Sequence, residues 1–375
     1  MKDIIALRHY LHQHPELSNH EVETATTLSA FIQALHPAAT FDVGSTGKIA
    51  LFKGAAAGPT VLFRAELDAL PIGEISTLPY RSQNGGVAHL CGHDGHMSIL
   101  AGLAQYIARN KPTKGTVGLL FQPAEEVEQG ARDVLHSKVF QQLKPDYMFA
   151  LHNIPGYPLH QVILKEGSFS AASQGMTVTL SGKTAHAAEP ENGLNPATAI
   201  ARIIDAMHRL RTEDELFEQR ILITIIHIQL GEIAFGTSPG HAIIRMTLRA
   251  FENRDMEQLT KIATSRIRQI AQKERLGCSI EFSEVFPATM NDAECVSIVE
   301  DVAKHCDLSV VQRQQPFSWS EDFGYYTSTI KGGFFGIGAG TEQAALHNPD
   351  YDFPDALLKT GIDLFSNIYR KLLCE

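Results

Sequence analysis

The order of strand-like and helix-like segments constrains the fold of this chain more than any other feature of its sequence. Towards both ends, short apolar runs typical of buried strands alternate with helical segments, as at Val117–Phe121, Tyr147–Leu151 and Gly332–Ile337. This alternation predicts an α/β fold with a mixed, mostly parallel sheet and helices on both faces. A predicted strand at Thr60–Leu67 and a predicted helix at Met97–Ala108 fit the same arrangement.

The pattern changes between residues 171 and 285. Here the order is strand, helix, strand, strand, helix, strand, which is typical of a small α+β unit of the ferredoxin-like kind. We expect this small domain, at 171–285, to be inserted into a larger domain formed by residues 1–170 and 286–375. The six segments are Gln174–Leu180, Asn195–Arg211, Ile221–Gln229, Ala242–Phe251, Met256–Lys273 and Cys278–Glu284.

The balance of acidic and basic residues limits the kinds of molecule that the protein is expected to bind. The chain has 32 basic and 42 acidic residues, a net charge of −10, which argues against nucleic-acid or anionic-membrane binding. The N-terminal segment lacks an apolar run followed by a cleavage site, and the longest apolar stretch, Ile221–Leu230, is too short to span a bilayer. Five scattered cysteines without a CxxC pair favour a reduced compartment, so we expect a cytoplasmic protein.

One local pattern predicts the start of a helix near the N-terminus. Ser18 is followed three residues later by Glu21, which is the spacing of a capping box. In such a box the two side chains satisfy backbone N–H groups at the helix start. We therefore expect a helix from this point to about Leu35.

Polar residues directly follow three of the predicted strands. Asp68 comes after the first, Glu125 and Glu126 come after the second, and His152 comes after the third. In open α/β sheets the ligand crevice lies beyond the carboxyl ends of the strands, so these side chains could converge there. Taken singly, a glutamate pair is more often a solvated face, and a lone histidine is more often a buried core residue.

The run Cys91-Gly92-His93-Asp94-Gly95-His96 is a stronger signal. Cysteine, histidine and carboxylate together form the ligand set of borderline divalent metals such as Zn²⁺. A closed structural zinc site is the alternative, although such sites are usually rich in cysteine. Two metals could share a bridging water, with one of Glu125 and Glu126 holding a metal and the other moving a proton.

Motifs spread over nearly the whole chain resemble one family. The chain is similar to the metal-dependent amidohydrolases that include hippurate hydrolase, N-acyl-amino-acid aminoacylases, thermostable carboxypeptidases and plant auxin-conjugate hydrolases. The resemblance implies a zinc-peptidase-like catalytic domain with a binuclear metal centre. The motifs, in family order, are RHYLHQHPELSNHEVETA, FRAELDALPI, HLCGHDGH, FQPAEE, ALHN, GKTAHAAEP with NPATA, EDF at 321–323 and HNPDYDFPD.

The resemblance implies a role for each matching residue of the catalytic domain. Cys91 would bridge two metals, Glu125 would act as general base and acid, and Asp68 would orient a ligand histidine. Two divalent ions are implied, and Zn²⁺, Mn²⁺, Ni²⁺ and Co²⁺ are all compatible with this mixed set. The remaining implied ligands are His93, Glu126, His152 and His347.

In the inserted domain the resemblance implies substrate contacts and a lid or dimerisation role. His186 would polarise the scissile carbonyl, from the same or a neighbouring subunit, and Arg249 would pair with a substrate carboxylate. Asn195 suits a helix N-cap, which alone would explain it, and it is also a candidate for contact with the substrate. An exposed edge strand could form a homodimer, although the sequence leaves monomer, dimer and tetramer open.

Two departures from the family pattern concern the pocket. Glu66 stands where the family usually has Asp, which predicts a slightly reshaped floor beneath the metals. The segment 231–249 lacks the family's Asn-x-Ile-Pro near Gly236–Pro239 and has Met246 in place of Gly. These changes lie beside Arg249, so they bear on the substrate and not on the metal site.

These observations predict an enzyme that hydrolyses the amide bond of N-acyl amino acids, its small-molecule partner, to a carboxylate and a free amino acid. The alternatives are a deacetylase of the N-acetyl-diaminopimelate type, or a carboxypeptidase or dipeptidase with the same machinery. From another class, a non-catalytic, metal-loaded binding module remains open, although the presence of both Glu125 and Glu126 argues against it.

Overall fold

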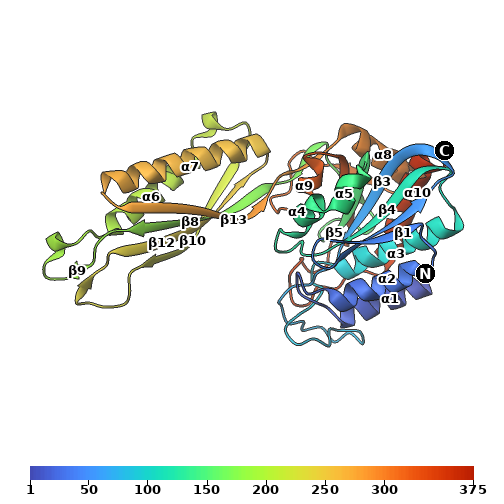
Figure 1. The fold of residues 1–375 in the computed structure, drawn as a ribbon, viewed down its shortest axis with the longest axis horizontal. Helices are drawn as coiled ribbons and strands as arrows, with labels where there is room; N and C mark the ends of the chain where they lie inside the picture. Colours follow the sequence, from blue (N-terminus) through green and yellow to red (C-terminus); the bar gives the residue numbers. More distant parts are fainter. The chain divides into compact units, whose positions relative to one another are not determined.

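The computed structural model describes residues 1–375 and divides into two compact units. The first comprises Met1–Phe169, Thr289–Pro316 and Glu321–Glu375, and the second comprises Ser170–Ala288 and Phe317–Ser320. In Figure 1 each unit has its own sheet and its own helices. The boundaries drawn from the sequence place Phe317–Ser320 in the larger domain, whereas the structure groups this short segment with the second unit.

An eight-stranded mixed sheet forms the centre of the first unit, in the order β1-β2-β4-β3-β5-β16-β6-β15 (Figure 1). Strands β4, β3, β5 and β16 run parallel to one another. The pairs β1–β2, β2–β4 and β6–β16 are antiparallel. The strands span Ala39–Val43 (β1), Gly47–Lys53 (β2), Ala56–Glu66 (β3), Lys114–Gln122 (β4), Tyr147–Ile154 (β5), Val162–Leu164 (β6), Val310–Gln312 (β15) and Lys331–Gly338 (β16).

Helices cover both faces of this sheet, which confirms the predicted fold class. Successive side chains of a strand point to opposite faces. In β16, Phe335 packs on Phe365 of α10, whereas Phe334 packs on Phe323 beside α9, with ring centroids 6.0 and 5.4 Å apart. The helices of this unit span Lys2–Gln13 (α1), Val22–Gln33 (α2), His93–Arg109 (α3), Gly130–His136 (α4), Lys138–Leu143 (α5), Ala293–His305 (α8), Gly324–Thr327 (α9) and Ala356–Leu373 (α10).

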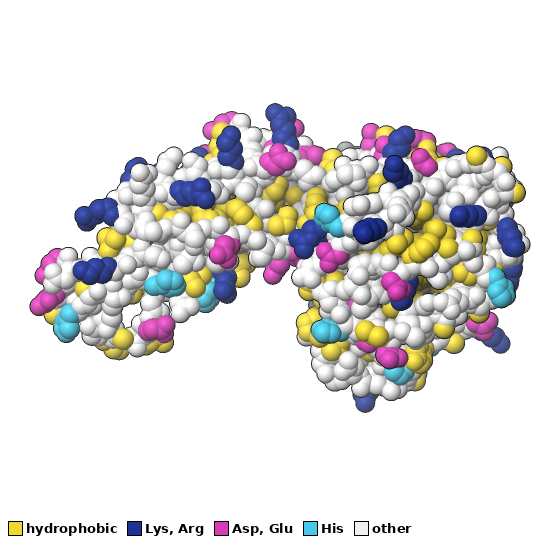
Figure 2. Space-filling model, viewed as in Figure 1, with side chains coloured by type: hydrophobic (Ala, Val, Ile, Leu, Met, Phe, Trp, Pro, Cys, Tyr) yellow, Lys and Arg dark blue, Asp and Glu magenta, His cyan; other side chains and the backbone are white.

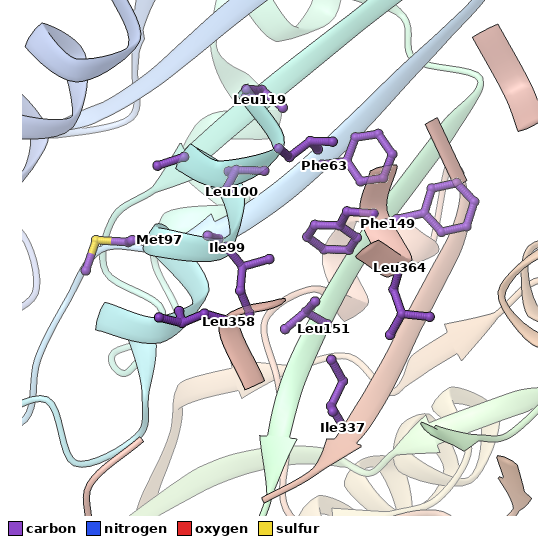
Figure 3. Close-up of a cluster of buried hydrophobic side chains, with 14 of the residues drawn as sticks. Phe63, Met97, Ile99, Leu100, Leu119, Phe149, Leu151, Ile337, Leu358 and Leu364 are labelled. Carbon is purple, nitrogen blue, oxygen red and sulfur yellow. The ribbon is translucent and has the colours of Figure 1, made fainter. Parts of the chain in front are cut away.

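The main apolar core lies between the sheet and helices α3 and α10 (Figure 3). Phe63, Phe149 and Leu151 of the strands are buried there with Leu100 of α3 and Leu364 of α10. Because both faces are covered, the parallel strands are apolar along most of their buried length and do not alternate. Burying each such side chain contributes roughly 1.5–3 kcal/mol. The core therefore holds the ends of these strands in fixed positions.

The second unit is an antiparallel sheet with the order β10-β12-β8-β13. Its chain order is β8, α6, β10, β12, α7, β13, so the predicted ferredoxin-like arrangement is confirmed. A small two-stranded ribbon pairs β9 with β11. The elements of the second unit span Ala172–Ser181 (β8), Ala185–His186 (β9), Ala197–Leu210 (α6), Ile221–Leu230 (β10), Thr237–Ser238 (β11), His241–Ala250 (β12), Asn253–Lys273 (α7) and Gly277–Phe286 (β13). The first unit has a further strand pair, β7 (Gly167–Ser170, of which Ser170 is grouped with the second unit) with β14 (Thr289–Asn291).

Two predicted helix starts are wrong. Helix α3 begins at His93 and not at Met97, so it includes the second half of the Cys-Gly-His-Asp-Gly-His run. Helix α2 begins at Val22 without a side-chain cap, and Ser18 instead donates a hydrogen bond to Asp68 Oδ2 over 2.7 Å. None of the helices combines the length and the apolar character that crossing a lipid bilayer requires.

A buried ionic cluster ties helix α1 to α3 and to the segment before α10. Arg8 donates to Asp352 Oδ1 and to the carbonyl of Phe353, each over 2.8 Å. Nδ1 of His12 lies 2.9 Å from Asp94 Oδ2 in the first turn of α3. Burial alone would lower the pKa of His12, but the Asp94 carboxylate outweighs burial and raises it to about 9. The cluster is thus built around a buried imidazolium.

This cluster predicts a pH-dependent stability. The folded-state pKa of His12 lies above its unfolded value of about 6.5, so its stabilisation is complete below pH 6.5 and is lost as pH rises through about 9. We expect metal-free protein to lose up to roughly 3 kcal/mol of unfolding free energy across this window in urea titrations. His12→Asn should make the profile less steep by the contribution of one proton, with the remaining slope due to other groups of raised pKa such as His93, whereas His20→Asn, an exposed control, should leave the slope unchanged. An unchanged slope in His12→Asn would contradict this assignment.

Candidate metal centre

Polar side chains gather where the parallel strands of the first unit end. Strands β4, β3 and β5 are direct neighbours, so their carboxyl ends lie at one edge of the sheet. Asp68 follows β3 and Glu125 follows β4, as the sequence predicts. His152 lies inside β5, which continues to Ile154, and not beyond the strand end as predicted. Its ring nevertheless faces the same edge, because it contacts Cys91.

Five overlapping sets of candidate metal-ligand side chains form in this region, and in each set the ligand atoms lie within 4.8 Å of one another. Three sets consist only of predicted site residues: Cys91 with His93 and His152, Cys91 with Glu126 and His347, and His93 with Glu125 and Glu126. The other two are Glu66 with His93 and His96, and Glu125 with Glu321 and Asp322. The structure therefore brings together all five predicted ligands and the predicted general base. Cys91 belongs to the first two sets, which is the placement that a bridging ligand needs.

The orientation of two imidazoles suits metal binding. Nδ1 of His93 lies 2.8 Å from the backbone carbonyl of Asp68, and Nδ1 of His152 lies 2.9 Å from that of Asn153. A carbonyl oxygen only accepts hydrogen bonds, so each Nδ1 must carry the proton. In the neutral ring the lone pair is then on Nε2, which points to the other ligands.

The spacing of the ligand atoms leaves room for a cation. Glu126 Oε1 lies 3.8 Å from Nε2 of His93 and 3.7 Å from Nε2 of His347, beyond hydrogen-bond range. Nε2 of His93 and Oε1 of Glu126 are both buried without a hydrogen-bond partner. Buried polar atoms are normally paired. Ligand atoms about 2 Å from a common Zn²⁺ would be separated by such distances, so the residues fit a metal.

The charges of Arg64 and His93 compensate the acidic groups of the site only in part. Burial raises the pKa of the Cys91 thiol well above its usual range, and the carboxylates of Glu126 and Glu125 add to the effect. Burial likewise raises the pKa of Glu125 well above its usual range, with further contributions from Glu321, Glu126 and Asp322. The pKa of Glu126 rises to about 7, mainly through burial. Divalent cations would reverse these shifts by favouring the anionic forms.

Burial and the neighbouring charges also shift the pKa values of the histidines in the site. Burial alone would lower the pKa of His93, but Asp68, Glu66 and Glu126 raise it to about 10. In metal-free protein His93 therefore binds a second proton on Nε2, the nitrogen that would otherwise bind a metal. Burial lowers the pKa of His152 well below its usual range, and burial with the charge of His93 lowers that of His347. Both rings remain neutral and available as ligands.

Gly92 makes the turn between Cys91 and His93 feasible. Its φ of +94° lies in a region that favours glycine. A Cβ at this position would lie 2.4 Å from Oδ1 of Asn153, the residue that follows His152. The close approach lets Cys91 and His93 face His152 from one tight turn. Gly92 therefore serves the ligand geometry.

Asp68 supports the site through more than its expected contact. Its backbone carbonyl is the nearer partner of His93, and its Oδ1 lies 3.6 Å from the same ring nitrogen. Its Oδ2 accepts hydrogen bonds from the backbone N–H of Glu126, over 2.9 Å, and from Ser18. Asp68 thus contacts the segments carrying two candidate ligands. That role is broader than orienting a single histidine.

Sequence reasoning missed a buried guanidinium beneath the site. Arg64 donates to Gln122 over 2.9 Å, to Glu321 over 2.9 Å and to Asp322 over 2.6 Å, and it also pairs with Glu66. The FRAELDALPI and EDF motifs contain four of these residues, but neither motif by itself indicates that their side chains meet. The pairing requires the folded sheet.

Glu66, the departure from the family's Asp, has two partners. Oε1 pairs with Arg64, and Oε2 lies 2.8 Å from Nδ1 of His96. Nε2 of His96 in turn lies 2.5 Å from Oδ1 of Asn153. The extra methylene of Glu relative to Asp lets one side chain span both partners. The chain of contacts ends at Asn153, beside the candidate ligand His152.

Three predicted residues belong to the second unit. His186 is exposed in the β9–β11 ribbon, where its backbone pairs with Thr237. Asn195 accepts a hydrogen bond from the N–H of Ala197 over 2.9 Å, as a residue supporting the start of α6 does. Arg249 lies in β12, and its NH1 donates to the carbonyl of Ser318 over 3.0 Å. Their expected substrate contacts stay predictions.

Comparisons with known proteins identify the family. The family model described as peptidase family M20/M25/M40 matches residues 62–371. Hippurate hydrolase of Campylobacter jejuni is 30% identical over 374 residues, covering 98% of this chain and 96% of that protein. N-acetyl-L-cysteine deacetylase of Bacillus subtilis is 32% identical over 377 residues, covering 99% of this chain and 88% of that protein.

Among solved structures, a dinuclear metal-binding peptidase of the M20 family from Bacillus subtilis superimposes with a TM-score of 0.85. It is 26% identical in sequence, and the match covers 99% of this chain and 98% of that one. The fold and the relatives define a hydrolytic enzyme. The chain belongs to peptidase family M20/M25/M40.

The shared position of Cys91 predicts how metal affinity should respond to substitution. Cys91→Ser replaces the thiolate by a weak ligand in two sets at once. We expect Zn²⁺ affinity, measured by competition with a chromophoric chelator, to fall by more than the roughly 10–100-fold that loss of a supporting partner costs. Cys374→Ser, a partly exposed control, should bind as native protein does. Native affinity in Cys91→Ser would exclude Cys91 as a ligand.

Proposed function

We propose that this enzyme hydrolyses the amide bond of N-acyl amino acids with the help of two divalent metal ions. The two named relatives support the substrate class, because hippurate and N-acetyl-L-cysteine are both N-acyl amino acids. The dinuclear metal-binding peptidase supports the number of ions. The single observation that carries the proposal is the placement of Glu125 within the overlapping metal-ligand sets, as a carboxylate additional to the five predicted ligands.

Cys91 would bridge the two ions, and the four other ligands would complete their coordination. Bound ions would lower the pKa of a water towards about 7 and polarise the scissile carbonyl. Zn²⁺, Mn²⁺, Co²⁺ and Ni²⁺ all suit this mixture of thiolate, imidazole and carboxylate. The four other ligands are His93, Glu126, His152 and His347.

Glu125 would transfer a proton from the attacking water to the leaving nitrogen. Its carboxylate lies 4.0 Å from Nε2 of His93 and within a set of ligand atoms that includes Glu126. As a base it would accept a proton from the attacking water, and as an acid it would deliver that proton to the leaving nitrogen. Burial raises the pKa of Glu125 in the metal-free protein, and bound cations would favour the anionic form that a general base requires.

Residues of the second unit would recognise the substrate. His186 would donate to the scissile carbonyl, and Arg249 would pair with the carboxylate of the amino acid. Asn195 is a further candidate contact. The sequence around Arg249 differs from the family pattern, so a deacetylase of the N-acetyl-diaminopimelate type, a carboxypeptidase or a dipeptidase stays an alternative with the same catalytic machinery.

Substitution of Glu125 tests the mechanism directly. Metal-stripped protein would be reloaded with Zn²⁺, Mn²⁺, Co²⁺ or Ni²⁺ and assayed for free amino acid from N-acetyl and N-benzoyl amino acids and dipeptides. We expect Glu125→Gln to lower kcat by about 10²–10⁴-fold with metal content unchanged. Glu166→Gln, at an exposed position, serves as the matched control. A binding module would show no metal-dependent turnover of any substrate, and Glu125→Gln would change nothing.

The second unit also has a candidate surface for a homodimer. Strand β10 is an edge of the four-stranded sheet, and Ile226, Ile228 and Leu230 are exposed on it. This strand contains no Lys, Arg, Asp or Glu, whereas the opposite edge, β13, carries Glu281 and Glu284. Charged side chains protect edge strands from pairing. Figure 2 shows apolar side chains on both units, so exposure alone does not single out an interface.

Oligomeric state tests this surface. We expect native protein to sediment as a dimer at micromolar concentration, and Ile228→Lys to sediment as a monomer because it places a charge on the uncharged edge. Phe282→Lys on β13 serves as the control for a new lysine on an exposed edge. A native monomer, or equal effects of the two substitutions, would exclude β10 as the interface.

A further inference from the structure

The loop between β4 and α4 carries both Glu125 and Glu126 and has an unusual backbone. Ala124 has a φ of +52° and Glu128 a φ of +63°, in the left-handed region that non-glycine residues rarely adopt. Each such residue costs of order 1–3 kcal/mol and persists only when its surroundings impose it. Something outside the local sequence must therefore hold this loop.

The loop is partly held by its own backbone. The N–H groups of Gln129 and Gly130 donate to the carbonyl of Ala124 over 3.2 and 3.1 Å, and that of Glu128 donates to the carbonyl of Glu125 over 2.9 Å. A Cβ on Gly130 would lie 1.7 Å from the carbonyl oxygen of Pro123, so the loop closes too tightly for a side chain there. These contacts shape the turn but do not attach it to the rest of the unit.

Three buried carboxylates attach the loop. Glu21 Oε1 accepts from the N–H of Ala124 over 2.8 Å, before the two glutamates. Asp68 Oδ2 accepts from the N–H of Glu126 over 2.9 Å, and Asp322 Oδ2 accepts from the N–H of Ala131 over 2.9 Å, after them. The loop is thus fixed at its start, middle and end.

Glu21 and Asp322 come from distant parts of the chain. Glu21 lies 103 residues before Ala124, and its other oxygen accepts from Thr46 over 2.7 Å. Asp322 also accepts from Arg64 and from Gln122, the residue that ends β4. Both side chains are almost fully buried, at 0% exposure. The capping-box interpretation of Glu21 does not account for it, because α2 has no side-chain cap.

We propose that Glu21 and Asp322 are positioning residues that hold the strained loop of Glu125 and Glu126 in the geometry needed for metal binding and proton transfer. The inference rests on the proposed function for its kinetic consequence. Its structural consequence, restraint of the loop backbone, stands without it.

Glu21 offers a pair of variants that separates this role from general packing. Glu21→Gln retains an oxygen for the N–H of Ala124, and its amide can donate to the Thr46 hydroxyl. Glu21→Ala removes the acceptor. We expect Glu21→Ala to lower kcat about 10–100-fold with KM changed less than about twofold, and to lower metal affinity by a similar factor. Glu21→Gln should stay within about threefold of native protein on both measures.

Thr46→Ala is the matched control, because it removes the other partner of the same carboxylate and leaves the bond to Ala124. It should leave kcat unchanged. For Asp322, neither amide orientation of Asp322→Asn satisfies both Arg64 and Ala131, so a loss like that of Glu21→Ala is expected. Asp255→Asn is its control, since Asp255 is a buried carboxylate that accepts backbone N–H groups of Glu218 and Gln219 in the second unit.

Hydrogen exchange in metal-free protein provides a readout that does not depend on turnover. Peptides covering 122–131 should exchange faster in Glu21→Ala and Asp322→Asn than in native protein, Glu21→Gln and the two controls. The proposal is overturned if exchange of this loop is native in Glu21→Ala, or if Glu21→Gln is as damaged as Glu21→Ala. Absence of turnover in native protein would count against the proposed function, while exchange and metal affinity would still decide the positioning role.

Discussion

The pairing of Arg64 with buried carboxylates underlies the organisation of the catalytic unit. One guanidinium contacts Glu66, Glu321 and Asp322 at the carboxyl end of the central strands. Desolvating several carboxylates together is strongly unfavourable without a fixed cation. Arg64 supplies that cation permanently, since guanidinium does not lose its proton in proteins. The neighbouring cluster around Cys91 has no such residue, and there the positive charge must come from exchangeable ions.

This division explains why two adjacent acidic clusters behave differently. The charge of Arg64 holds the pKa of Glu66 well below its usual range against the effect of burial. A few ångströms away, burial raises the pKa values of Glu125 and Cys91. Burial also raises the pKa of Asp322 well above its usual range, although Arg64 donates to it. Because potential ligand atoms of Glu125, Glu321 and Asp322 lie within 4.8 Å of one another, the two clusters are continuous, and the compensation by Arg64 weakens towards the metal-ligand sets.

Much of the fold and part of the candidate metal centre could be predicted from the sequence, because the patterns that indicate them are local. Strand ends followed by polar residues located Asp68 and Glu125, and the order of elements defined the second unit. His347 was accessible only through family resemblance, because its loop has no distinctive local pattern. The capping-box prediction was wrong because both side chains can form hydrogen bonds elsewhere in the fold as well as at a helix start. The Ser18 hydroxyl donates one, and the Glu21 carboxylate accepts one. Their partners, Asp68 and Ala124, become neighbours only after the sheet has formed.

The position of β16 in the sheet has a consequence for synthesis of the chain. This strand, Lys331–Gly338, lies between β5 and β6 and is synthesised after the whole Ser170–Ala288 segment of the second unit. The catalytic sheet therefore stays divided, with one edge of β5 uncovered, while that segment is being made. The second unit consists mainly of one continuous segment, Ser170–Ala288, and can assemble earlier. The nascent chain thus carries an insert that can fold before its host does, with the edge of β5 open to pairing in the meantime.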